Sequence, residues 1–265
     1  MRDLHEQYAL WREGEPGRHL QKPDAAAVKR YFSPGKENAF LPCLVRGANG
    51  QRLAQFSWGF IPNWRSDKPH GDPLKAVDRQ KKALDIGRKT WNAASETMFD
   101  DEKPTWRDSA HDRRCVIVLD GFFTFHEQGD EKYPFFISPK DYYSLAVAGI
   151  WDVATIDGKE YLTCAIITKE ADEPMHQINN GGTKPHTMPI VLSPDQFDQW
   201  LEPIDKEDYA KVDALSELMA APSTRELEYI TVAKNEKGSV DDSPEALNHF
   251  EYKELKIDVA GLNKG

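Results

Sequence analysis

The sequence is poor in the features that mark secreted and membrane proteins. It contains no apolar run of the roughly eighteen residues that a membrane-spanning helix needs. Asp, Glu and Arg occur among the apolar residues of the first twenty positions, whereas a signal peptide requires an unbroken apolar stretch. We therefore expect a cytoplasmic protein without a membrane partner.

Cysteine is also scarce. Cys43, Cys115 and Cys164 are far apart in the sequence and form no Cys-x-x-Cys pair. Cys115 and Cys164 lie in the apolar runs RRCVIVL and LTCAIIT, where a thiol usually serves as a small buried hydrophobic group. We expect no zinc site from these three residues.

Basic residues are in the minority, with 34 Lys and Arg against 44 Asp and Glu and a net charge of −10. DNA-binding proteins usually carry a basic surface, because neutralising phosphates supplies most of their affinity. The overall charge therefore disfavours tight DNA binding. A local basic groove stays possible, because the acidic residues are frequent after Glu202 and can gather elsewhere.

Common catalytic signatures are missing as well. The sequence contains no GxGxxG, Walker A, HExxH or GxSxG motif, which removes the commonest nucleotide, zinc-protease and hydrolase sites. We expect no cofactor. The oligomeric state stays open at this level.

Short apolar runs of strand type fill the middle of the chain. We predict strands at 40–45, 52–60, 115–125, 133–137, 144–152, 160–168 and 228–232. Asn49-Gly50 and Asp157-Gly158 stand between consecutive runs and predict two hairpins. The runs are apolar almost throughout, as in strands covered on both faces or closed into a barrel. This density of strands joined by turns favours a mainly antiparallel α+β architecture.

Helices are predicted at both ends of the chain. Ranges 3–12, 24–31 and 75–89 have helical patterns. Ser193 begins a capping box with Pro194 at the first helical position, and a second amphipathic helix follows at 206–219. We expect one domain over residues 1–265, with an acidic helical C-terminal part from about residue 193.

Several residues are candidates for chemistry before any family is considered. His176 and His186 bracket the loop that holds Gly181-Gly182, although exposed loop histidines without a function are commoner. They lack carboxylate or cysteine partners at ligand spacing, so we expect no metal site. Trp64 is a candidate for stacking on a nucleic-acid base or for filling the core.

Five stretches occur in the order typical of the SOS-response-associated peptidase (SRAP) family: FSPG (32–35), SWGFIPNW (57–64), WNAASET (91–97), RRCVIVLDGFFTF (113–125) and MPIVLSP (188–194). YPFFI (133–137), AGIWD (148–152) and VDDSPEAL (240–247) add to the agreement. The chain thus resembles this family over about 32–247. The resemblance implies a partly barrel-like β core with flanking helices and a groove for single-stranded DNA.

The resemblance also implies a specific chemistry. In the family, a cysteine that follows the removed initiator Met crosslinks the aldehyde of an abasic site as a thiazolidine, and in some members it removes a short propeptide. An α-amine beside a thiol suits the capture of an aldehyde. An Asn, an Arg, a Glu and a His assist that cysteine.

This sequence departs from the family at most of those positions. Asn92 matches the Asn, but the cysteine, Arg, Glu and His are replaced by Arg2, Ala94, Thr124 and Asn179. Thr187 stands where an Arg precedes the Met-Pro pair. His176 and His186 are the candidate substitutes for the missing His. A hydroxyl is a poor replacement for a carboxylate acid or base.

Three hypotheses follow. The leading one is a SRAP protein that has lost the usual catalysis and still binds single-stranded DNA through Trp64, Arg65 and Asn92. A second is an active peptidase or abasic-site crosslinker rebuilt from other groups. A third is a module that binds a protein partner while the groove is vestigial.

Overall fold

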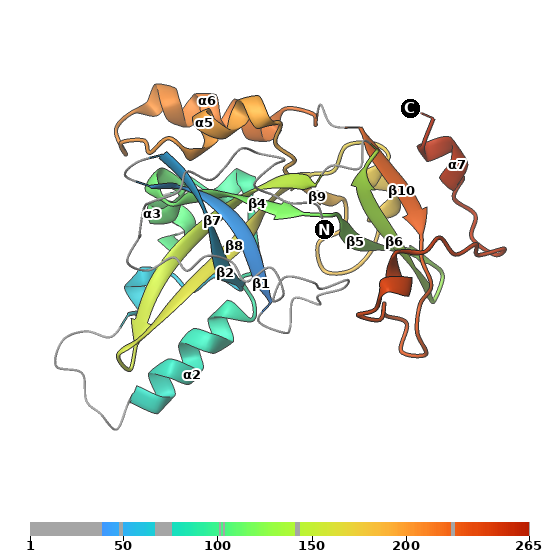
Figure 1. Ribbon diagram of the computed structural model, residues 1–265, viewed down its shortest axis with the longest axis horizontal. Helices are drawn as coiled ribbons and strands as arrows, with labels where there is room; N and C mark the ends of the chain where they lie inside the picture. The colour runs from blue at the N-terminus through green and yellow to red at the C-terminus, as the bar shows by residue number, and fades with distance from the viewer. Residues whose placement is uncertain are drawn as a thin grey trace.

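Five strands close into a barrel at the centre of the structure (Figure 1). The structure is a computed structural model, and it describes residues 39–47, 50–66, 76–100, 102, 104–140, 144–223 and 226–264. The barrel strands are β1 (Phe40–Gly47), β2 (Gly50–Trp58), β4 (Arg114–Leu119), β7 (Leu145–Ile156) and β8 (Lys159–Glu170). Antiparallel pairs join them in the order β2-β1-β4-β7-β8, and a short parallel pairing of β8 with β2 closes the ring.

Two short strands and a second sheet extend this barrel. β3 (Asn92–Ala94) pairs parallel with β8, and β9 (Thr187–Pro189) pairs antiparallel with it. The second sheet is antiparallel, with the order β10 (Leu227–Thr231), β6 (Glu131–Pro139) and β5 (Phe122–Gln128). The mainly antiparallel, barrel-like α+β fold predicted from the sequence is confirmed.

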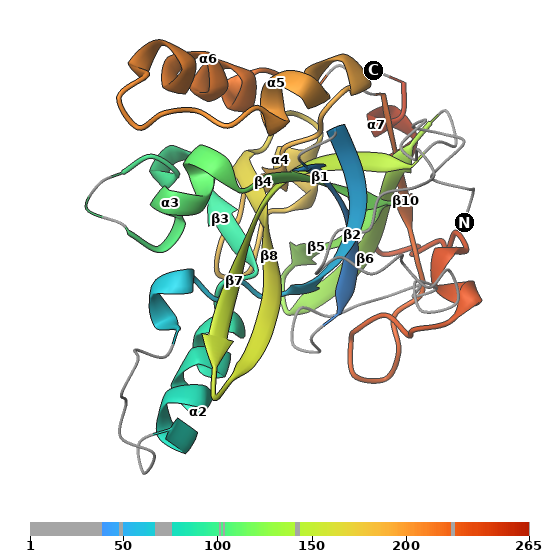
Figure 2. The same cartoon turned by 60° about the vertical axis from the view of Figure 1, so that its left-hand side comes forward.

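Helices flank the barrel on several sides (Figure 2). α5 (Phe197–Leu201) and α6 (Tyr209–Ala220) lie together above it, α3 (Pro104–Asp112) lies beside it and α2 (Ala76–Gly87) lies at the opposite end. The shorter helices are α4 (Met175–Ile178), α7 (Val259–Leu262), η2 (Asn63–Arg65), η4 (Ser95–Thr97), η5 (Pro194–Gln196) and η6 (Pro244–Leu247). Within the described ranges, no helix is long and apolar enough to cross a membrane.

Both predicted hairpins are present. β1 and β2 pair up to Gly47 opposite Gly50, and β7 and β8 pair up to Ile156 opposite Lys159. In the second hairpin, Asp157 and Gly158 have φ values of 54° and 69°. A two-residue hairpin turn of type I′ requires positive φ at both central positions, which Asp and Gly tolerate better than most residues.

The prediction of one strand over 115–125 is wrong. The chain bends at Asp120-Gly121, so that β4 belongs to the barrel and β5 to the second sheet. Gly121 lies so close to β6 that a Cβ there would stand 2.4 Å from the carbonyl oxygen of Ile137. A residue with a side chain therefore does not fit this bend. The bend delivers β5 to the edge of the candidate site described below.

The capping box at Ser193 is confirmed, with both reciprocal side-chain hydrogen bonds present at η5. α6 begins three residues later than predicted, at Tyr209, because Asp208 caps it by accepting a hydrogen bond from the backbone N–H of Lys211. The helices predicted at 3–12 and 24–31 lie outside the described residues.

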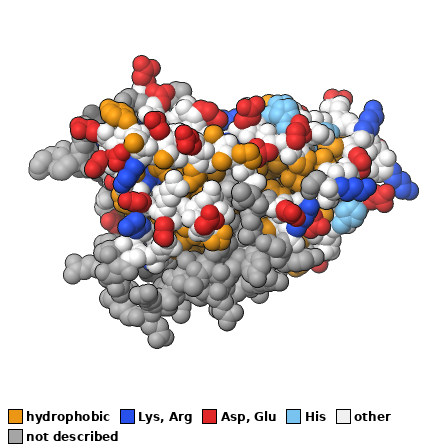
Figure 3. All heavy atoms as spheres, turned by 90° about the horizontal axis from the view of Figure 1, so that it is seen from above, with side chains coloured by type: hydrophobic (Ala, Val, Ile, Leu, Met, Phe, Trp, Pro, Cys, Tyr) orange, Lys and Arg blue, Asp and Glu red, His pale blue; other side chains and the backbone are white. Residues whose placement is uncertain are grey.

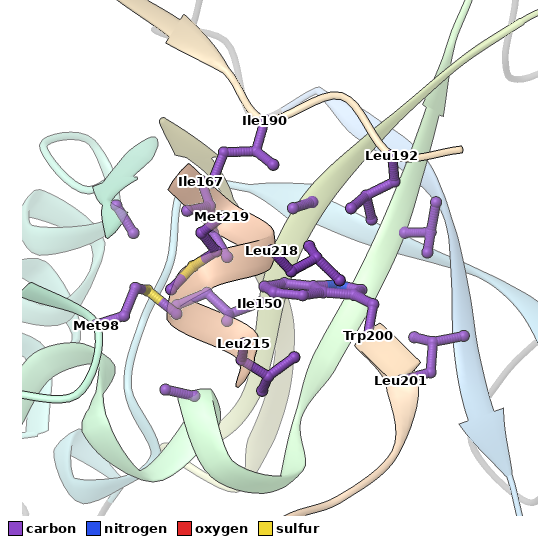
Figure 4. Close-up of a cluster of buried hydrophobic side chains, with 14 of the residues drawn as sticks. Met98, Ile150, Ile167, Ile190, Leu192, Trp200, Leu201, Leu215, Leu218 and Met219 are labelled. Carbon is purple, nitrogen blue, oxygen red and sulfur yellow. The ribbon is translucent and has the colours of Figure 1, made fainter. Parts of the chain in front are cut away.

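Trp200 occupies the centre of the core between the barrel and the upper helices (Figure 4). Its side chain is fully buried, and its indole N–H donates a 2.8 Å hydrogen bond to the carbonyl oxygen of Cys115. Val116 of β4 belongs to this cluster, whereas Cys115 and Ile117 on either side of it belong to a second cluster, which the barrel strands and the second sheet share. The barrel strands are therefore covered on both faces, which explains their continuous apolar runs.

The three cysteines, distant in sequence, meet inside the barrel. Cys43 on β1, Cys115 on β4 and Cys164 on β8 lie close enough for their thiols to interact, and all three thiols are free and buried. Burial raises the pKa of each thiol. Cys115 and Cys164 act here as small core side chains, as predicted, and Cys43 does the same.

Candidate functional site

A pocket of about 600 Å³ lies between β5, the end of β8 and the segment that precedes β9. Five aromatic side chains line it: Trp58, Trp91, Phe122, Phe123 and Phe125. Asn92, Thr124, Asn179 and Thr187 also line it. The structure therefore brings together four positions that the sequence comparison with SRAP motifs had singled out. We call it the aromatic-lysine pocket, since three lysines complete its wall.

Asn92 reaches the pocket because β3 pairs with β8. Its partner in the parallel register is Ile166, and the preceding Trp91 carbonyl accepts hydrogen bonds of 2.9 Å from the indole of Trp58 and from the amide of Ile166. These bonds fix the backbone while leaving the Asn92 side chain exposed. Ala94, two residues on, is half-buried and is not part of the pocket wall.

Thr124 and Asn179 are joined directly. The Thr124 hydroxyl donates a 3.1 Å hydrogen bond to Asn179 Oδ1, and Asn179 Nδ2 donates to the carbonyl oxygen of Thr187 at 2.7 Å. A hydroxyl and an amide do not change charge near neutral pH. The positions where the family resemblance implies a carboxyl and an imidazole are therefore filled by neutral groups bonded to each other.

Glu127, which the sequence did not predict as a site residue, supplies the one carboxylate among the described residues that line the pocket. Lys132 Nζ lies 2.6 Å from Glu127 Oε1, and this hydrogen bond holds the pKa of the carboxyl below its ordinary value. Asn180 fixes the backbone of Glu127 by accepting from its N–H at 2.7 Å and donating to its carbonyl oxygen at 2.9 Å. Only glycine fits at Gly181 without moving this side chain, because a Cβ there would lie 2.4 Å from Glu127 Oε2.

The pocket wall is basic although the chain is acidic. Among the described lining residues, Lys89, Lys132 and Lys184 face the single carboxylate of Glu127, which gives these residues a formal charge of +2 in a chain of net charge −10. Lys89 and Lys184 are exposed and make no ion pair with other described residues. Sequence reasoning left a local basic groove open, but the three lysines come from segments too far apart for the sequence to group them.

The candidate substitutes His176 and His186 lie together but not in the pocket wall. Their rings stack with centroids 3.9 Å apart, and His186 Nδ1 lies 2.9 Å from the carbonyl oxygen of His176. His176 Nδ1 also lies 3.8 Å from Glu173 Oε1. The two histidine side chains thus pack against each other.

Trp64 and Arg65 lie in η2. Trp64 lines a different cavity from the one that Asn92 lines, and Arg65 is the next residue in the chain. Trp64 keeps 46% of its surface exposed, and the Arg65 guanidinium lies 4.1 Å from the centre of its ring. Their predicted role in DNA binding stays a prediction. Arg2 lies outside the described residues.

Metal ligation finds no support in the part of the chain that the structure describes. No group of three or more His, Cys, Asp or Glu side chains there has an arrangement that would hold a metal ion. The pocket's polar groups are amides, hydroxyls, amines and one carboxylate, which are suited to hydrogen bonding and to anions.

Comparisons with known proteins agree with this architecture. The family model described as SOS response associated peptidase (SRAP) matches residues 19–236. A protein named abasic site processing protein YoqW from Bacillus subtilis is 27% identical over 206 residues, which cover 77% of this chain and 80% of that protein. YedK from Escherichia coli, which bears the same descriptive name, is 31% identical over 144 residues, 54% of this chain and 52% of that protein.

Solved structures share the fold. A protein from Bacteroides thetaiotaomicron superposes with a TM-score of 0.69 at 23% identity, covering 88% of this chain and 94% of that one. A protein from Bordetella bronchiseptica gives a TM-score of 0.55 at 22% identity, with coverage of 74% and 85%.

Proposed function

Because the chain belongs to the SOS response associated peptidase family, we propose that its aromatic-lysine pocket binds single-stranded DNA. The observation that carries this proposal is the formal charge of +2 on the pocket wall of a chain with a net charge of −10. Lysines neutralise phosphates, and stacking on an aromatic side chain contributes about 1–3 kcal/mol per base. The names of the relatives support damaged DNA, with an abasic site, as the physiological form.

We also propose that this chain lacks the cysteine-dependent crosslinking that the family resemblance implies. Arg2 carries no thiol, and Ala94 carries no charge for a phosphate. Thr124 and Asn179 hydrogen-bond to each other at 3.1 Å and offer neither an acid nor a base. Asn92 is retained and is available to position a DNA strand. We therefore expect DNA binding without covalent capture.

Fluorescence anisotropy with a short labelled oligonucleotide tests the binding. Lys184→Gln removes a pocket charge, and Lys253→Gln removes a charge from an exposed lysine that does not line the pocket. We expect Lys184→Gln to weaken binding by up to about eightfold at about 50 mM salt, as the loss of one phosphate contact implies. Equal effects of the two variants would mean that binding is not in this pocket.

A denaturing gel tests the loss of catalysis. The protein, with its natural N-terminus, is incubated with a single-stranded oligonucleotide that carries an abasic site. We expect no covalent band. A band that depends on the natural N-terminus would contradict the proposal and would favour the rebuilt-enzyme hypothesis. Mass spectrometry of the N-terminal residue would then identify the nucleophile.

A further inference from the structure

A second pocket, of about 710 Å³, lies away from the one described above. Its wall is built by η2, by the C-terminal half of α3, by the middle of β7 and by the segment that leads into α6. It shares no lining residue with the aromatic-lysine pocket. The face that carries α5 and α6 shows many acidic side chains and fewer basic ones (Figure 3).

The charge of this pocket is opposite to that of the first. Five aspartates line it: Asp108, Asp112, Asp152, Asp205 and Asp208. Three basic residues face them: Arg113, Lys206 and Lys211. The formal charge of the described lining residues is therefore −2 with histidine neutral, which disfavours phosphate binding. We call it the acidic pocket.

Most of these aspartates already have a partner. Asp152, which is 4% exposed, lies 3.2 Å from Arg113 and accepts a 2.7 Å hydrogen bond from the backbone N–H of Asn63. Asp108 lies 2.8 Å from Lys206. Asp205 is exposed and makes no ion pair with any described residue, so its charge is left for a ligand.

His111 gives a second, independent indication of a ligand. It lines the acidic pocket and is 8% exposed, and its Nδ1 is buried without a hydrogen-bond partner among the described residues. Burial lowers the pKa of this imidazole, so the neutral form is favoured. His111 Nε2 also makes no hydrogen bond with the described part of the chain. An uncharged ring with the proton on Nδ1 would present Nε2 to the pocket as an acceptor.

Trp64 adds an aromatic surface at the rim. It is 46% exposed, and Arg65 already stacks on it at 4.1 Å, which demonstrates that a guanidinium fits its face. Exposed cation–π contacts of this kind contribute about 0.5–1 kcal/mol. A carboxylate, a neutral imidazole acceptor and a tryptophan face together suit a cation that carries N–H donors.

We infer that the acidic pocket is a binding site for an arginine or lysine side chain in a basic peptide segment of a protein partner. A second cavity of about 640 Å³ continues from it and shares Asp205, Lys206 and Asp208. Glu207 lines that continuation and makes no ion pair with a described residue. The site is therefore longer than one side chain, which favours a peptide with two basic residues over a single small cation. It is separate from the proposed DNA site, so the chain has room for both ligands.

Isothermal titration of the full chain with the peptide acetyl-Gly-Arg-Gly-Lys-Gly-amide tests this inference. Asp205→Asn removes the unpaired pocket charge, and Asp213→Asn removes one charge from the exposed face of α6 outside the pocket as the matched control. We expect Asp205→Asn to weaken binding about fivefold and Asp213→Asn to leave it nearly unchanged. Equal weakening by both variants would reduce the interaction to attraction by the net charge and would overturn the inference.

Trp64→Leu tests the aromatic part without changing any charge. We expect it to weaken peptide binding by about two- to fivefold. Loss of DNA affinity in this variant, with peptide affinity retained, would assign Trp64 to DNA and overturn the inference. Spermidine is the second probe. If it binds as tightly as the peptide and responds in the same way to both variants, the ligand is a free polyamine and the inference of a peptide is overturned.

Discussion

Neutralising Glu127 is expected to strengthen binding of single-stranded DNA. Glu127 holds Lys132 Nζ at 2.6 Å, which withdraws one of the three pocket lysines from the phosphates. In Glu127→Gln the ammonium is released, because a neutral amide attracts it less than a carboxylate does. The variant therefore presents three available lysines where the natural chain presents two.

The magnitude follows from the release of counterions. Each phosphate neutralised on a single strand changes the slope of log affinity against log salt by about −0.7. We expect slopes of about −1.4 for the natural chain and about −2.1 for Glu127→Gln. If the two bind equally at about 1 M salt, the variant binds about eightfold more tightly at about 50 mM.

The assay is fluorescence anisotropy with one labelled oligonucleotide over a series of salt concentrations. Asp130→Asn is the matched control, since Asp130 lies exposed in the turn after β5 and does not line the pocket. A slope unchanged in Glu127→Gln, or an equal change in both variants, would refute the reasoning. The first result would mean that Lys132 does not reach a phosphate, and the second that only the net charge matters.

Three further outcomes are expected. Gly181→Ala should raise DNA affinity with a stability change below about 1 kcal/mol, because the three atoms nearest to its Cβ all belong to the flexible Glu127 side chain, which it displaces; anisotropy and urea unfolding measure the two effects. Trp200→Ala should lower the free energy of unfolding by about 3–5 kcal/mol, and Trp64→Ala by less than about 0.5 kcal/mol, in urea titrations. Burial raises the pKa of Tyr229 from 10.0 to about 12, so its contribution to stability is complete below pH 10 and is lost as pH rises through that interval. Urea unfolding at pH 9 and about pH 11 should show a smaller loss in Tyr229→Phe than in the natural chain; an equal loss would contradict this assignment.

Local patterns in the sequence predicted much of the fold. Asp157-Gly158 predicted a hairpin because two adjacent residues that tolerate positive φ select one turn type. Ser193 predicted a helix start because a capping box lies within four residues. The bend at Gly121 was missed, since the apolar run continues across it and only its packing against the carbonyl of Ile137 demands glycine.

The sequence also predicted part of the candidate site. The order of family-like segments identified Asn92, Thr124 and Asn179 as positions to inspect, and all three line one pocket. Their assignment to a function stays a prediction, as does the single domain over residues 1–265. Glu127 was not foreseen, because its importance depends on contact with Gly181 across the loop.

The sequence by itself determined the barrel-like α+β architecture and the residues that stand where a catalytic group would be expected. Periodicity, turn residues and motif order are local or sequential properties, and they can be read directly. Only the tertiary structure decided where charge gathers. Lys89, Lys132 and Lys184 meet at one pocket and the aspartates at another, because strand pairing joins segments that are distant in the chain. A chain with a net charge of −10 therefore has two cavities whose described lining residues carry formal charges of opposite sign.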